Sequence, residues 1–257
     1  MSENRPLILV TNDDSIYSKG IKSLVEAVSS LGEVIVVAPD SPQSGMGHAV
    51  TIHGILRINE EKIFGDIKAY TTSGTPVDCV KLAIAKVLPR KPDLLVSGIN
   101  HGSNSSINVI YSGTMSAAVE GAVEGIPSVG FSLLDFSADA DFRAAMKIAH
   151  DVSKQILEDK GLPEGTCLNV NIPKGSPEEI KGVKICRQAK ANWEDNFDHR
   201  IDPMGKPYYW MLGEFKNYDK GEDTDEFALS HQFISIVPVH YDLTAYHAIS
   251  HLQQWTL

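Results

Sequence analysis

Short runs of large apolar residues alternate with longer amphipathic segments up to about residue 176. Runs that are apolar at every position are typical of parallel strands with both faces buried. They predict strands at residues 7–10, 33–38, 92–97, 128–132 and 167–172. Apolar residues at helical spacing predict helices at residues 18–31, 76–88, 114–125 and 139–160. The order of these elements indicates an α/β fold with a mainly parallel sheet and right-handed crossovers.

The remaining polar regions predict fewer regular elements. Residues 55–58 and 68–72 are expected to form a small antiparallel excursion, and residues 180–186, 207–212 and 233–237 further strands. A polar stretch between them carries Trp193, Tyr208, Tyr209 and Trp210. Because aromatic residues need a surface to bury against, part of this tail is expected to reach a neighbouring subunit. We expect one domain, with a core of about residues 1–187 and a C-terminal β-rich extension of about residues 188–257.

Composition narrows the class of protein. The 257 residues suffice for one α/β domain, and the formal net charge of −10, with no basic run, argues against a nucleic-acid-binding role. Three cysteines without a C-x-x-C pair fit a reducing cytosol. The first six residues lack the apolar core of a signal peptide, and no segment has 18 uninterrupted apolar residues. We therefore expect a cytoplasmic protein without a membrane partner.

Polar side chains follow three of the predicted strands. Asp13 and Asp14 end the first, Ser44 follows the second, and Asn100 and Asn104 follow the third. Because the carboxyl ends of parallel strands share one edge of the sheet, these oxygens are expected to meet there. Adjacent carboxylates repel unless a cation or strong donors hold them, and such oxygens suit Mg²⁺ or Mn²⁺. The alternative is an Asp-Asp turn that only caps the next helix.

The helix that begins near Thr114 supplies a candidate anion site. Gly113 allows close approach of the backbone, free N–H groups at a helix start favour phosphate, and the hydroxyls of Ser112 and Thr114 add donors. The alternative is a plain N-cap by Thr114. His48 and His101 lie on the same loops and are more often structural, although either could reach a leaving group. Together the features fit metal-assisted hydrolysis of a phosphate ester.

The sequence lacks the motifs of other nucleotide-binding proteins, phosphatases and hydrolases. It contains no G-x-x-x-x-G-K-[ST] loop, no G-x-S-x-G elbow and no D-x-D pair after the first strand. The glycines at 45 and 47 lack the third glycine of a dinucleotide fingerprint and follow the second strand. Zinc is less favoured because no Cys or His pair has ligand spacing.

Several motifs occur in a fixed order along the chain. They are VTNDD at 10–14, APD at 38–40, SGMG at 44–47, GTPVDCV at 74–80, SGINHGSN at 97–104 and YSGT at 111–114. With DP at 202–203, YYW at 208–210 and TD at 224–225, they resemble the survival protein E (SurE) family of 5′/3′-nucleotidases over essentially the whole chain. The resemblance implies a Rossmann-like three-layer α/β core and a divalent-metal-dependent phosphatase acting on nucleoside 5′- and possibly 3′-monophosphates. It also implies homodimers or homotetramers built through C-terminal arms.

The resemblance assigns roles position by position. The family's metal ligands, which hold one divalent ion per subunit (Mg²⁺ or Mn²⁺), fall on Asp13, Asp14, Ser44 and Asn100. Its phosphate contacts fall on Asn104, Ser112, Gly113 and Thr114. We take Asp13 and Asp14 as the catalytic residues, with Asp14 as the candidate proton acceptor.

Two serines depart from the family pattern. Ser15 and Ser106 stand where the family has glycine, and a serine would be strained there if the backbone needs a positive φ. These departures keep open a second hypothesis, a catalytically inactive nucleotide-binding or scaffold protein on the same fold.

Overall fold

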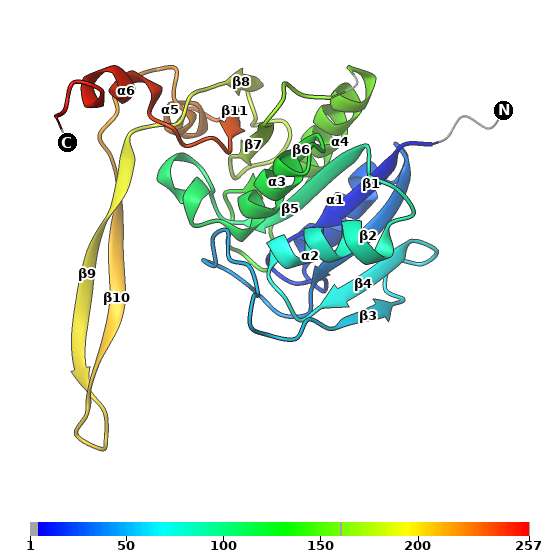
Figure 1. Ribbon diagram of the computed structural model, residues 1–257, viewed down its shortest axis with the longest axis horizontal. Coiled ribbons are helices and arrows are strands. Elements are labelled where there is room, and N and C mark those ends of the chain that lie inside the picture. Colours follow the sequence, from blue (N-terminus) through cyan, green and yellow to red (C-terminus); the bar gives the residue numbers. More distant parts are fainter. Residues whose placement is uncertain (1–4, 160, 257) are drawn as a thin grey trace.

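The structure is a computed structural model that describes residues 5–159 and 161–256 (Figure 1). The first four residues, used in the argument on targeting, and Lys160, the expected end of the long helix, lie outside the described residues. Within the described ranges no helix combines the length and the apolarity needed to cross a membrane.

A mixed sheet forms the body of the protein, and its described part has nine strands in the order β3-β4-β2-β1-β5-β6-β7-β11-β8. Their bounds are β1 Leu7–Thr11, β2 Glu33–Pro39, β3 Ile58–Glu61, β4 Lys68–Thr72, β5 Leu94–His101, β6 Ser128–Leu133, β7 Thr166–Ile172, β8 Val183–Ile185 and β11 Ile234–His240. From β4 to β7 every neighbouring pair is parallel, whereas β3 runs antiparallel to β4 and β11 antiparallel to β7. The predicted α/β fold with a mainly parallel sheet is confirmed.

Helices cover both faces of this sheet (Figure 1). They are α1 Lys19–Val28, α2 Pro76–Leu82 with the π-helical turn η1 Ala83–Val87, α3 Gly113–Val123, α4 Arg143–Glu158, α5 Asp225–Ser230 and α6 Tyr246–Leu252, and the 3₁₀ turn η2 spans Ser106–Ile110. Along β1, Ile8 and Val10 pack with residues of α1 and α4, while Leu7 and Leu9 pack with residues of α2 and α3. Because the apolar side chains of a central strand are buried on both faces of the sheet, the sheet lies between two layers of helices, which gives three layers.

Glycines let two helices lie close to the sheet. A Cβ at Gly20 of α1 would stand 2.0 Å from the carbonyl oxygen of Ile99, and a Cβ at Gly121 of α3 would stand 2.1 Å from Oγ of Ser128. Helix α3 is therefore held tightly against the strands whose carboxyl ends carry the candidate site.

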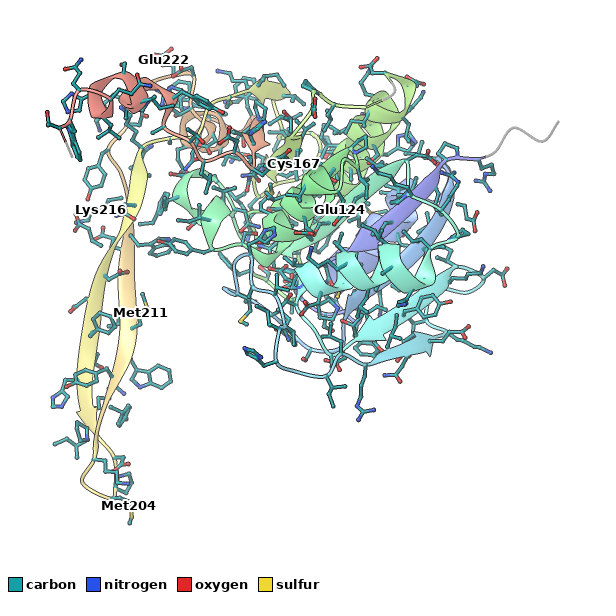
Figure 2. All side chains as sticks on the ribbon, in the orientation of Figure 1. Glu124, Cys167, Met204, Met211, Lys216 and Glu222 are labelled. Carbon is teal, nitrogen blue, oxygen red and sulfur yellow. The ribbon has the colours of Figure 1, made fainter. Side chains whose placement is uncertain are left out.

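The strands β9 Ala191–Ile201 and β10 Pro207–Asn217 form a long antiparallel hairpin that projects from the body (Figure 1). Met204 marks its tip in Figure 2. Strand β10 extends the strand predicted at 207–212. Strand β9 was not predicted, because its side chains are exposed on both faces and show no apolar alternation.

The C-terminal part contributes to the body as well as to the hairpin. The strand predicted at 233–237 is confirmed as β11, and β8 covers part of the strand predicted at 180–186. The excursion predicted at 55–58 is shifted to β3, and its partner β4 also pairs in parallel with β2. The short helices α5 and α6 were not predicted.

Candidate functional site

Asp13 follows β1 and is almost completely buried. Its Oδ1 accepts a hydrogen bond of 2.6 Å from Oγ1 of Thr114, in the first turn of α3. A Cβ added to Gly113 would lie 2.8 Å from Cβ of Asp13. Glycine at this position therefore lets the start of α3 press directly against the carboxylate.

Asp14 is half-buried and connects the end of β1 to the end of β5. Its Oδ2 accepts a hydrogen bond of 3.2 Å from the backbone N–H of His101. The preceding residue, Asn100, donates through Nδ2 to the carbonyl oxygen of Gly102 at 2.9 Å. This bond occupies the amide nitrogen of Asn100, so its carbonyl oxygen is the atom available as a cation ligand.

The two carboxylates have unfavourable surroundings for their negative charge. Burial, and then the neighbouring charge of Asp14, raises the pKa of Asp13 to about 6, although the Thr114 hydrogen bond opposes this. Burial also raises the pKa of Asp14, against a smaller lowering by the N–H of His101. A divalent cation would remove this cost, so the donor set fits a hard metal ion. Among the described residues no three His, Cys, Asp or Glu side chains gather as a metal cluster, so a cation beside the two aspartates would need other oxygen ligands.

The loop that carries Ser44 spans from Asp13 to the start of α3. The N–H of Gln43 donates to the carbonyl oxygen of Asp13 at 2.7 Å, and the N–H of Gly47 donates to the carbonyl oxygen of Tyr111 at 3.1 Å. Ser44 lies between these two attachments and is exposed. The structure therefore brings the loop of the third predicted ligand to the edge that carries the aspartates.

The start of α3 differs from the alternative prediction in one respect. Ser112, not Thr114, is the N-cap, because its Oγ accepts the N–H of Met115 at 3.0 Å. The plain N-cap by Thr114 is therefore wrong. Thr114 binds Asp13 instead, so the start of α3, the candidate anion site, is in direct contact with Asp13.

Asn104 is held in a buried network of amides and hydroxyls. Its backbone N–H donates to Oδ1 of Asn171, its Nδ2 donates to Oγ of Ser132, and its carbonyl oxygen accepts from Nδ2 of Asn169, each at 2.8 Å. Ser132 pairs with Asn100 across β5 and β6, so Asn104 lies beside the same edge. Sequence reasoning missed Asn169 and Asn171. The available signal was two asparagines at alternate positions of the apolar strand β7.

Ser15 and Ser106, for which the resemblance implies glycine positions, both adopt a conformation that glycine favours. The φ angles are +80° at Ser15 and +52° at Ser106. Oγ of Ser106 donates to the carbonyl oxygen of Ala189 at 2.9 Å, and its N–H donates to Oδ2 of Asp225 at 2.7 Å. Burial raises the pKa of Asp225, which also accepts the N–H of Ala189 at 2.9 Å. Asp225, which sequence reasoning did not assign, thus ties the loop after Asn104 to the root of the hairpin.

The two candidate histidines have partners outside the site. Nε2 of His48 lies 2.8 Å from Oε2 of Glu120, whose Oε1 is 2.5 Å from Nζ of Lys81. Nδ1 of His101 lies 3.1 Å from the carbonyl oxygen of Asp135. Their side-chain contacts are therefore structural, as expected for the commoner case.

Together these contacts define an α/β protein with hard oxygen ligands and a helix N-terminus joined at the carboxyl edge of a parallel sheet. Such a site suits a divalent cation and a phosphate-like anion together.

Comparison with known proteins identifies the family. Residues 8–195 match the family described as Survival protein SurE. The chain is 58% identical over 257 residues to 5′-nucleotidase SurE of Flavobacterium psychrophilum, with 99% of both chains covered. It is 59% identical over 259 residues to 5′-nucleotidase SurE of Christiangramia forsetii, covering 100% of this chain and 99% of the relative. The crystal structure of the SurE protein from Aquifex aeolicus superposes with a TM-score of 0.83 at 42% identity, covering 96% of this chain and 98% of that one. The chain belongs to the SurE family.

Proposed function

We propose that this chain is a divalent-metal-dependent 5′-nucleotidase, a phosphatase that hydrolyses nucleoside 5′-monophosphates to nucleoside and phosphate, with 3′-monophosphates as a second candidate substrate. One observation carries the proposal: the 2.6 Å hydrogen bond from Thr114 to Asp13, which joins the carboxylate pair to the N-terminus of α3. The full-length relatives named 5′-nucleotidase SurE support the same activity.

In this proposal Asp13, Asp14, Ser44 and Asn100 hold one Mg²⁺ or Mn²⁺ ion per subunit. An ion bound there would neutralise phosphoryl oxygens and lower the pKa of a water molecule. The protein's own part is to fix the ligands: Thr114 orients Asp13, and the N–H of His101 orients Asp14. Fixed ligands avoid reorganisation when the substrate arrives.

Asn104, Ser112, Gly113 and Thr114 are proposed to bind the substrate phosphate. The backbone N–H groups at the start of α3 have no helical acceptor and favour an anion. Ser112 keeps its hydroxyl proton for the phosphate, since Oγ acts only as an acceptor towards Met115. The buried asparagines of β7 hold the backbone at Asn104 in place.

Asp14 is proposed to take the proton of the attacking water. Asp13 is nearly inaccessible and already accepts the Thr114 hydroxyl, whereas Asp14 is half-buried and faces the loop of β5. A proton acceptor must be reached by the water that it deprotonates, and Asp14 is the more accessible of the two carboxylates.

The test is release of inorganic phosphate from a panel of 5′- and 3′-nucleotides with Mg²⁺ or Mn²⁺, repeated with a chelator. We expect metal-dependent turnover. Tight nucleotide binding by calorimetry without turnover at any metal concentration would favour the inactive scaffold instead. We favour the enzyme over that alternative, because Ser15 and Ser106 adopt the positive φ angles that glycine would adopt.

We further propose a homodimer or homotetramer built through the C-terminal arms, within a single domain with a core of about residues 1–187. The exposed aromatic side chains of the hairpin and of α6 support this, since they lack a covering surface within the described chain. We also propose a cytoplasmic location, which the three free, buried cysteines support, and no nucleic-acid or membrane partner.

A further inference from the structure

A cleft of about 480 Å³ lies between η2 and the root of the β9–β10 hairpin. Tyr111 lines one side of it, and Trp193, Asp195 and Met211 of the hairpin line the other. Tyr111 immediately precedes Ser112, the N-cap of α3, so their Cα atoms are about 3.8 Å apart. The cleft therefore begins where the proposed phosphate site ends.

Trp193 is fixed in place while part of its indole remains accessible. Its Nε1 donates to Oδ1 of Asn108 at 2.7 Å, and Phe215 meets it edge to face at 5.5 Å between ring centroids. A Cβ at Gly213, on the opposite strand, would lie 3.1 Å from Cε3 of Trp193, so glycine makes room for the ring. The side chain nevertheless keeps 40% of its surface exposed. A ring held this way loses little entropy when a flat ligand stacks on it.

Asn108 also ties this ring to the phosphate side of the cleft. Its carbonyl oxygen accepts the N–H groups of Tyr111 and Ser112, both at 3.1 Å, while its side chain accepts the indole of Trp193. Asn108 thus fixes the Trp193 ring and the backbone of Tyr111 relative to the helix N-cap. A ligand spanning from Ser112 to Trp193 would meet a preformed site.

We propose that this cleft binds the nucleobase of the substrate, with Trp193 and Tyr111 as stacking surfaces and Asp195 as an acceptor for a base N–H. The proposal rests on the proposed function, because it takes the phosphate to lie at the start of α3. Aromatic stacking tolerates every base, since each has a π-face, and the larger rings of purines gain more contact. The cleft accordingly favours nucleotides over base-free phosphomonoesters, and purines over pyrimidines.

The first test compares kcat/KM for AMP with kcat/KM for ribose 5-phosphate, which lacks the base. In Trp193→Ala, and separately in Tyr111→Ala, we expect the preference for AMP to fall at least about tenfold, mainly through a higher KM for AMP. The matched control is Phe197→Ala, which removes an exposed aromatic from the same hairpin outside the cleft lining. An AMP preference that is unchanged in both cleft variants would overturn the proposal.

The second test requires neither a metal nor catalysis. Trp210 and Trp255 are exposed, so Trp210→Phe with Trp255→Phe leaves Trp193 as the remaining tryptophan emitter. Adenosine, added in the presence of EDTA, is expected to quench this emission, and ribose is not. Absence of quenching up to the solubility of adenosine would overturn the base site even if AMP is hydrolysed. Quenching without any phosphate release would refute the proposed function and leave the base site standing.

Discussion

The loops around Asp13 and the β9–β10 hairpin differ in where their contacts lie. Each candidate site loop is bonded to another loop of the same chain: Thr114 to Asp13, His101 to Asp14, and Gly47 to Tyr111. The hairpin pairs mainly with itself, and along its length apolar side chains are exposed on both faces. The candidate site is built from loops that contact one another within one chain, whereas the hairpin presents exposed apolar side chains that a further surface would cover.

Because of this difference, we expect substitutions in the two regions to affect different properties, namely turnover and subunit association. A change among the site loops alters groups that already contact one another, so it is expected to alter turnover. A change towards the hairpin tip alters exposed aromatic surface, so it is expected to alter association first. The root of the hairpin, where Trp193 contacts Asn108, belongs to both regions.

The largest expected effect comes from Asp13→Asn. Loss of one buried carboxylate removes a proposed metal ligand and its charge, and phosphate release from AMP should fall at least about 100-fold. The asparagine carbonyl can still accept the Thr114 hydroxyl, so the circular dichroism spectrum of the variant should stay close to that of the wild type. Full activity of this variant in the presence of chelator would contradict the proposed site.

When the metal is removed, the destabilising effect of burying the Asp13 carboxylate should become measurable in the free energy of unfolding. Because its folded-state pKa is raised to about 6 from 3.8, the metal-free folded state favours the protonated carboxyl. Its stabilising contribution is present below about pH 4 and is lost as the pH rises through about 6. Asp13→Asn lacks this titration. In EDTA, the free energy of unfolding of the variant minus that of the wild type should therefore increase by about 1–3 kcal/mol between pH 4 and pH 7. Urea titrations at the two pH values measure it.

A pH-independent difference between the variant and the wild type in EDTA would show that the carboxylate is not destabilised by burial. Adding Mg²⁺ or Mn²⁺ at pH 7 should stabilise the wild type and leave Asp13→Asn nearly unchanged, because only the wild type offers both carboxylates.

At the hairpin, replacing Tyr209 and Trp210 together by serine should shift the protein towards smaller species in light scattering after size exclusion. Both side chains are more than half exposed in the single chain, at 61% and 58%. Turnover on AMP should change less than it does in Asp13→Asn. Glu214→Ser, a polar exposed position on the same hairpin, should leave the size unchanged. An unaltered oligomer in the double variant would contradict assembly through this arm.

The smallest expected effect distinguishes the two serines with positive φ. Glycine at either position relieves left-handed strain of about 1–2 kcal/mol, offset partly by greater freedom in the unfolded chain. Ser106→Gly also deletes the buried hydrogen bond to Ala189, worth about 1 kcal/mol, whereas Oγ of Ser15 only accepts the N–H of Tyr17 at 3.2 Å. Ser15→Gly should therefore be the more stable of the two by about 1 kcal/mol in urea unfolding. The reverse order would contradict the role given to the Ser106 hydroxyl.

Apolar runs predicted the parallel strands because both faces of each are buried in the same body. The same signal was absent from β9, Ala191–Ile201, because its side chains are exposed on both faces and apolar residues do not alternate along it. The N-cap was placed two residues late, since Ser112 and Thr114 are equally good caps in sequence and only the contact with Asp13 distinguishes them.

Local sequence patterns predicted the layered α/β architecture, the approximate positions of the central strands and the chemical types of the candidate ligands, because burial and periodicity are properties of neighbouring residues. The end of β5 was predicted wrongly at residue 97, since the strand continues to His101 and includes Asn100. Tertiary structure alone decided that Thr114 binds Asp13, 101 residues away, and that Asp225 binds Ser106, 119 residues away. Such contacts form only when the strands are arranged in their order in the sheet, and that order cannot be predicted from the pattern of neighbouring residues.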